Sequence, residues 1–107
     1  MQITQTKLDQ YKKKYGNIHL IEVILEDGSN EVEPVTAQAI LKHPSMDVVL
    51  AASDSYPDSP IRQGIMILEN CWVEGDERIR TIDEAKAGAA IQAASLFRIK
   101  LASIKKL

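Results

Sequence analysis

The only cysteine and the only tryptophan of the chain, Cys71 and Trp72, are adjacent, and an acidic turn at 74–77 follows them. A cysteine beside carboxylates could bind a metal ion or act as a nucleophile. A metal site needs several ligands of matched softness, and a nucleophilic cysteine needs a base and an orienting group. The two histidines, His19 and His43, are distant in sequence from Cys71 and have no ligand-type spacing. We therefore predict that Cys71 is a buried apolar residue, with a partner-facing thiol as the alternative.

The other chemistry-bearing patterns are weak. The sequence contains no glycine-rich phosphate loop, no GxSxG and no HExxH. Residues 53–59 hold serines and aspartates but lack the alternating ligands and closing glutamate of a calcium loop. We interpret His19 and His43 as structural residues. The sequence thus predicts a protein that is not an enzyme, with no catalytic, cofactor-binding or metal site and no cofactor.

Length and composition set the broad class. The chain has 107 residues, of which 45% are hydrophobic, which predicts one globular domain over residues 1–107. No apolar run approaches the roughly 20 residues of a membrane span, and the first 16 residues lack the apolar core of a signal peptide. A single cysteine fits a reducing compartment. These features predict a cytoplasmic protein without membrane contact.

Charge is segregated along the chain, although the net charge is only −2. Residues 1–16 and 81–107 are basic, whereas 17–35 carry five acids and no base. Such a dipolar chain could self-associate, and solvated helix faces explain the pattern equally well. Three lysines, Lys12–Lys14, lie between two tyrosines and could contact nucleic acid, but the mildly acidic chain disfavours this reading.

The first third of the chain predicts a helix and a hairpin. Residues 4–15 read as a short polar helix that Gly16-Asn17 ends. Residues 18–25 read as a strand, since β-branched residues dominate. One face of this strand would carry His19, Ile21, Val23 and Leu25. Asp27-Gly28 favours a type I′ turn into a second strand at 30–35, with Pro34 at its end.

Everything after Pro34 reads as helical. Thr36 can cap a turn of helix over 37–42, and Ser45 can cap a helix over 46–53. Pro60 suits the start of the next helix. That helix carries one apolar stripe, formed by Ile61, Ile65, Leu68 and Trp72.

The last predicted helix is the longest. Gly75 would end the preceding helix, and Thr81 and Glu84 would form a capping box. The helix would then run to about Leu107, and its alanine-rich part, 85–95, would pack against the 61–72 helix. The predicted fold class is α+β: a basic N-terminal helix (1–16), a short antiparallel β-hairpin (17–35), and a mainly α-helical bundle with a long C-terminal helix (36–107).

The order of these predicted elements is similar to that of a known class of small proteins. A short hairpin is followed by "AILKHPSMDVVLAAS", by "ILENCWVEGDERI" and by an alanine-rich segment that ends in "LASIKKL". The pattern resembles small tail-assembly-chaperone-like proteins of tailed phages and prophages. It covers roughly residues 18–107 and leaves out the N-terminal helix. Glu74 stands where those relatives often have the first glycine of a Gly-Gly-Asp turn.

The resemblance implies a non-enzymatic role in the host cell cytoplasm. Such chaperones bind the long hydrophobic tape-measure protein, or another tail protein, and keep it soluble until tail-tube subunits polymerise around it. They also tend to form homo-oligomers. An apolar helix stripe would cover the client. The partner-binding residues expected here are Trp72, Phe97, Leu101 and Ile104.

Two other classes stay open. One is a small oligomeric structural component of the virion, which would be present in purified particles. The other is a nucleic-acid-binding regulator that uses Lys12–Lys14 and the basic C-terminus, whose binding would fall steeply with salt.

Overall fold

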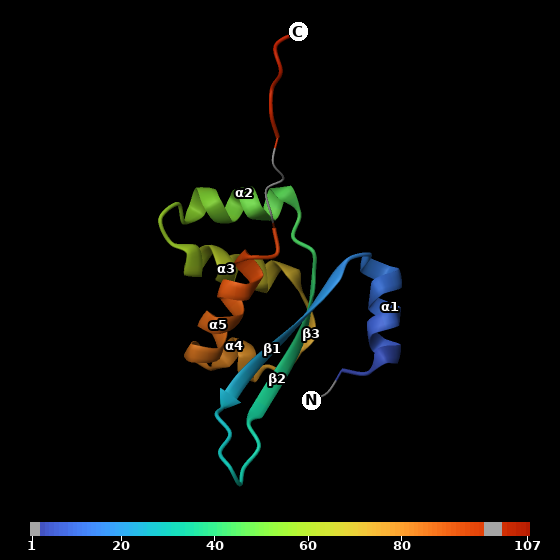
Figure 1. The fold of residues 1–107 in the computed structure, drawn as a ribbon, viewed down its shortest axis with the longest axis vertical. Helices are drawn as coiled ribbons and strands as arrows, with labels where there is room; N and C mark the ends of the chain where they lie inside the picture. The colour runs from blue at the N-terminus through green and yellow to red at the C-terminus, as the bar shows by residue number, and fades with distance from the viewer. Residues whose placement is uncertain (1–2, 98–101) are drawn as a thin grey trace.

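The chain has an α+β fold, as the sequence predicts. The computed structural model describes residues 3–97 and 102–107. A three-stranded antiparallel sheet, in the order β1-β2-β3, separates α1 from the other helices (Figure 1). The elements are α1 (Gln5–Tyr15), β1 (Ile18–Glu26), β2 (Val35–Lys42), α2 (Met46–Ser55), α3 (Pro60–Cys71), β3 (Trp72–Gly75), α4 (Arg78–Thr81) and α5 (Asp83–Ala94).

β1 confirms the predicted strand and its two faces. Ile21 is buried, and Val23 and Leu25 pack against the core. The alternate residues Leu20 and Ile24 are exposed. The period-2 pattern of the sequence therefore places one face of β1 on the helices and leaves the other toward solvent.

The connection after β1 differs from the predicted tight turn. Gly28 lacks the positive φ that a type I′ turn requires, and among the described residues only Gly16 has it. The chain reverses instead around Ser29 and Val32, whose backbone groups exchange hydrogen bonds of 2.7 and 3.4 Å. The predicted strand at 30–35 is wrong, since residues 27–34 form an irregular loop and the second strand begins at Val35.

Residues 35–42 form β2, so the predicted helix after Thr36 is also wrong. Ala37, Ala39 and Leu41 are fully buried on the face that β1 shares with the helices. Alanine and leucine favour helices in isolation, but pairing on both sides of β2 and burial of this face override that propensity.

Small residues bring α3 and α5 into close contact over the sheet (Figure 1). Ala85, Ala89, Ala90 and Ala93 of α5 are buried. Gly64 of α3 faces the backbone of Ala90, where a Cβ would overlap the carbonyl group. The alanine-rich stretch thus packs against α3, as expected. α2 covers α3 from outside, and Ser45 and Ser59 cap α2 and α3.

α3 ends four residues earlier than the predicted stop at Gly75, and β3 follows it directly. β3 pairs with β2 through Ala39–Gly75 and Ile40–Glu74. A Cβ on Gly75 would meet Ala39 and the Trp72 ring. Gly75 is therefore needed for the close approach of these strands, and it does not stop a helix.

The last helix differs most from the prediction. Ile82 precedes α5 without a side-chain cap, and the Thr81 hydroxyl donates to the Glu77 carbonyl, so the predicted capping box is absent. α5 ends at Ala94, and residues 102–107 have no regular structure. The predicted long C-terminal helix is therefore wrong. The helical part predicted over 36–107 is confirmed only in part, since it comprises α2 to α5 and also contains the strands β2 and β3.

α1 covers the other face of the sheet (Figure 1). Lys7 donates to one Glu74 carboxylate oxygen at 2.7 Å, and the Tyr11 hydroxyl donates to the other at 2.9 Å. Ile40, the partner of Glu74 in the ladder, is fully buried on this face. The predicted basic helix is confirmed, and it docks on β3 through Glu74.

Candidate protein-binding edge and other candidate sites

Within the described chain, the outer edge of β1 is an unpaired sheet edge that carries exposed apolar side chains. Its nine residues pair with β2 on one side, and no described strand pairs with the other side. Leu20 and Ile24 are 49% and 59% exposed. Natural sheets usually protect such an edge with charges, proline or a covering element. Here Glu22 is the only charge between the two apolar side chains.

The register shows which backbone groups face the open side. The His43 amide donates to the Asn17 carbonyl at 3.1 Å, and opposed residues in an antiparallel ladder alternate between bonded and non-bonded pairs. Every second residue after Asn17, namely His19, Ile21 and Val23, therefore points its amide toward β2. The residues that point their amides outward are Ile18, Leu20, Glu22 and Ile24.

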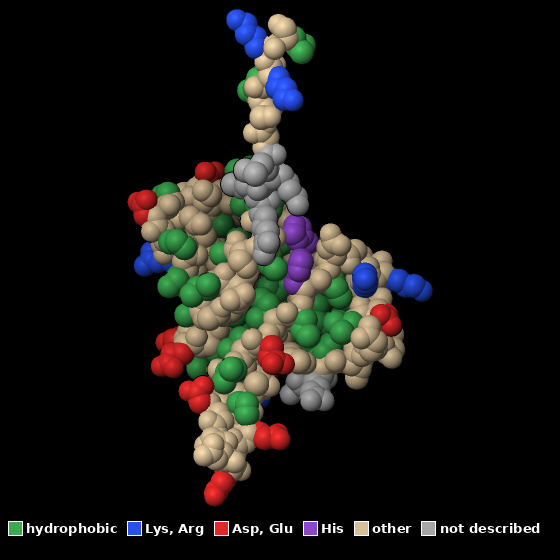
Figure 2. Space-filling view, viewed as in Figure 1, with side chains coloured by type: hydrophobic (Ala, Val, Ile, Leu, Met, Phe, Trp, Pro, Cys, Tyr) green, Lys and Arg blue, Asp and Glu red, His purple; other side chains and the backbone are tan. Residues whose placement is uncertain are grey.

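Two hollows border this edge, one on each side of the strand. The first, of about 440 Å³, lies between residues 18–22, Gln92 of α5, and Leu96 just beyond that helix. The second, of about 250 Å³, lies between β1 and one face of α1. Leu20 lines both. Hydrophobic side chains gather over the sheet beside α1 on this face of the molecule (Figure 2). An extended segment could lie along the edge between α1 and α5.

Trp72 is a half-buried residue that packs against the core. The Arg80 guanidinium lies 4.2 Å from the centre of its ring, a cation–π contact. Arg80 in turn makes ion pairs with Glu69 and Glu77. The Arg80 side chain thus covers one face of the Trp72 ring.

The other predicted partner-binding residues do not form one stripe in the described chain. Phe97 is half-buried just beyond α5, and Ile104 is fully exposed in the segment 102–107, which extends away from the sheet and helices (Figure 1). Leu101 lies outside the described residues. The helix that was expected to align these side chains ends before Phe97.

Cys71 is fully buried, as predicted. Burial raises the pKa of its thiol, with a smaller opposing effect from Lys42. A protonated thiol is a poor nucleophile and a poor metal ligand. Within residues 3–97 and 102–107, no group of three or more histidine, cysteine or acidic side chains could hold a metal ion.

The structure brings together two residues that sequence reasoning kept apart. Nε2 of His19 lies 2.9 Å from Nδ1 of His43, and the two rings are tilted by 43°. Desolvation lowers the pKa of His19, and the neighbouring His43 lowers it further. Both imidazoles lie side by side at the surface (Figure 2). The alternation of Ala37, Ala39 and Leu41 continues to His43, but it places His43 beside His19 only in the strand register that the structure shows.

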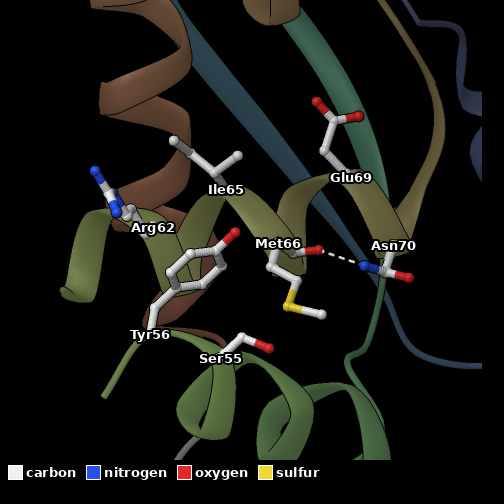
Figure 3. A pocket seen from close by; sticks show the side chains of 7 residues that line it. All are labelled: Ser55, Tyr56, Arg62, Ile65, Met66, Glu69 and Asn70. Carbon is white, nitrogen blue, oxygen red and sulfur yellow. Dashed lines mark hydrogen bonds between the residues drawn. The ribbon is translucent and has the colours of Figure 1, made fainter. Parts of the chain in front are cut away.

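A third hollow, of about 420 Å³, lies between α2 and α3 (Figure 3). Arg62 extends over the Tyr56 ring, 5.9 Å from its centre. The Asn70 amide donates to the Met66 carbonyl at 2.8 Å. The carboxylate of Glu69 binds Lys86 and Arg80. Arg62, Glu69 and Asn70 of this hollow are thus engaged with other groups of the fold.

Comparison with protein-family models, curated proteins and solved structures found no match to this chain. No helix in the described parts of the chain is long and apolar enough to cross a membrane.

Proposed function

We propose that this chain is a non-enzymatic, phage tail-assembly-chaperone-like protein that binds a tape-measure-type client in the host cytoplasm and keeps it soluble. The observation that carries the proposal is the open edge of β1, where outward-pointing amides lie beside exposed Leu20 and Ile24. Backbone pairing supplies affinity that tolerates sequence variation, and apolar neighbours favour a hydrophobic client. This combination suits a protein that must cover a long hydrophobic chain.

The mechanism differs from the helix-in-groove binding that the resemblance implies. An extended client segment would add to the sheet at β1, with its apolar side chains in the hollows beside Leu20. Phe97 and Ile104 supply a second contact in this proposal, and Trp72 an anchor at its exposed part. Leu101 keeps its proposed role on the resemblance alone.

Charge on the edge disfavours pairing between two copies of β1. A full antiparallel overlap of Ile18–Glu26 with itself would centre on Glu22 and place two carboxylates opposite each other. Directly opposed like charges destabilise a sheet. A client segment with a lysine or arginine opposite Glu22 has no such penalty. The homo-oligomeric virion component is therefore the second candidate.

Co-expression with the tape-measure protein of the same phage or prophage tests the proposal. The expected result is a soluble long protein that co-elutes with this chain at moderate salt. An insoluble tape-measure protein, with this chain eluting alone, contradicts it. Presence of the chain in purified particles would instead favour the structural component.

A further inference from the structure

We infer that His19 and His43 form a two-histidine binding site for a divalent transition metal of the zinc, copper and nickel group. His19 borders the hollow of about 440 Å³ that the proposed client contact also uses, but the two ligands lie at the paired ends of β1 and β2 and would bind an ion without any client. Imidazole nitrogens are preferred ligands of these ions. The two nitrogens that would bind already face each other across the strand pair.

The backbone holds both histidines in place before any metal arrives. His19 lies within β1, opposite Leu41 in the ladder. His43 follows β2, and its amide is bonded to the Asn17 carbonyl. Pro44, which is buried, restricts the preceding residue to extended backbone. A preorganised pair of ligands loses little conformational entropy on binding.

The spacing of the nitrogens is close to that of a chelate. Zinc binds imidazole nitrogen at 2.0–2.1 Å with tetrahedral angles, which places two ligand nitrogens about 3.3 Å apart. The observed separation is 2.9 Å. The two ring centres are 5.2 Å apart, so the nitrogens now point nearly straight at each other. Both imidazoles must turn by roughly 35° for their lone pairs to converge on one tetrahedral ion. The proton shared by the two nitrogens moves to the other nitrogen of its ring, so two neutral imidazoles present their lone pairs to the ion.

Water would complete the coordination. No third histidine, cysteine or acidic ligand joins the pair among the described residues. His43 is exposed, and His19 borders the hollow of about 440 Å³ beside β1. Both observations leave room for a hydrated ion. The expected site holds one ion per chain and is open to exchange, in contrast to a closed structural zinc site.

Titration calorimetry of the full chain with Zn²⁺ and Ni²⁺ tests the inference. We expect one ion per chain with a dissociation constant in the micromolar range. His19→Gln and His43→Gln should each weaken binding by at least about tenfold, because loss of a ligand costs at least as much as loss of an outer-shell partner. Gln92→Ala, which changes the same hollow without removing an imidazole, should leave the dissociation constant unchanged.

Undiminished binding in either histidine variant, or absence of binding at millimolar Zn²⁺, would overturn the inference. So would one ion per two chains, because a second copy would then complete the site. Nitrogen NMR of the unsubstituted chain gives an independent test. Zn²⁺ should shift Nε2 of His19 and Nδ1 of His43 together, whereas shifts of the other ring nitrogens alone would contradict the assignment.

Discussion

Gly64 of α3 lies directly against the backbone of Ala90 in α5, with no room between them for a Cβ atom. The two helices therefore meet backbone to backbone at this point, and their contact is the most extensive between any two helices in the described chain. Because both helices cover the inner face of the sheet, this one contact helps to set the position of the whole helical layer.

Gly64→Ala should destabilise the protein by about 3 kcal/mol, at the upper end of the cost of overpacking a core. The added methyl group would overlap the Ala90 carbonyl, and both atoms belong to rigid helices. Chemical denaturation measures the free energy of unfolding. Unchanged stability would show that the helices are further apart than the structure has them.

Gly88→Ala is the matched control on the same pair of helices. Gly88 is exposed in α5, and a Cβ there would meet nothing within 4 Å. Alanine should stabilise this helix by about 0.5–1 kcal/mol, since it loses less backbone entropy on folding. The two substitutions are chemically identical, so opposite signs would isolate the steric effect at Gly64.

Docking of α1 should depend on Glu74 and on pH. The hydrogen bond from Lys7, and then that from Tyr11, lower the pKa of Glu74 below its ordinary value of 4.5. The folded protein thus holds this carboxyl ionised more readily than the unfolded chain does. Its contribution is complete above the ordinary pKa and is lost as pH falls through the folded value.

Amide hydrogen exchange of α1 measures this dependence. Glu74→Gln should speed exchange throughout α1 at neutral pH and remove the further change in acid. Glu31→Gln, in the loop between β1 and β2, removes the same charge and should leave α1 unaffected. Equal protection of α1 in the chain with and without the Glu74 substitution would contradict the proposed docking contact.

Cys71 should be inert toward thiol reagents in the folded protein. Its side chain has no exposed surface, and burial raises the pKa of the thiol, so the reactive thiolate is scarce and inaccessible. Modification should follow the rate of unfolding and become stoichiometric in denaturant. Rapid labelling under native conditions would show a partner-facing cysteine instead.

Ile104→Ser should leave the free energy of unfolding unchanged, because the side chain is fully exposed in the folded chain. Any effect of Ile104→Ser on co-elution with the client must therefore come from weaker client binding and not from loss of folding. If the C-terminal segment is a secondary contact, client binding weakens without being lost. A large loss of stability would show that this segment packs on the domain.

The local sequence pattern correctly predicted the elements whose structure depends mainly on their own residues. The alternation in β1 and the Ser45 and Pro60 starts of α2 and α3 all appear where expected. Residues 35–42 were assigned wrongly, because alanine, glutamine and leucine favour a helix until two neighbouring strands pair with them. The predicted C-terminal helix is also absent over the described residues 95–97 and 102–107, for a different reason. Leu96 packs against the core, but Ile104 is fully exposed. A short helix without a packing partner is marginal in water.

The histidine pair could not follow from a hairpin with a tight turn. With a two-residue turn at Asp27-Gly28, Thr36 would lie opposite His19, and His43 would fall in the predicted helical part. The longer loop shifts the ladder so that His43 lies beside β1. Loop length therefore determined this site, and sequence pattern alone does not fix loop length.

A matched pair of variants tests whether the β1 edge binds the client. Leu20→Lys and Leu50→Lys introduce the same charge at leucines that are 49% and 52% exposed, the first on the edge and the second on α2. Each is co-expressed with the tape-measure protein, and circular dichroism verifies its folding. We expect Leu20→Lys to lose soluble co-elution of the tape-measure protein and Leu50→Lys to retain it. Retention by both variants, or loss in the α2 variant alone, would contradict the account.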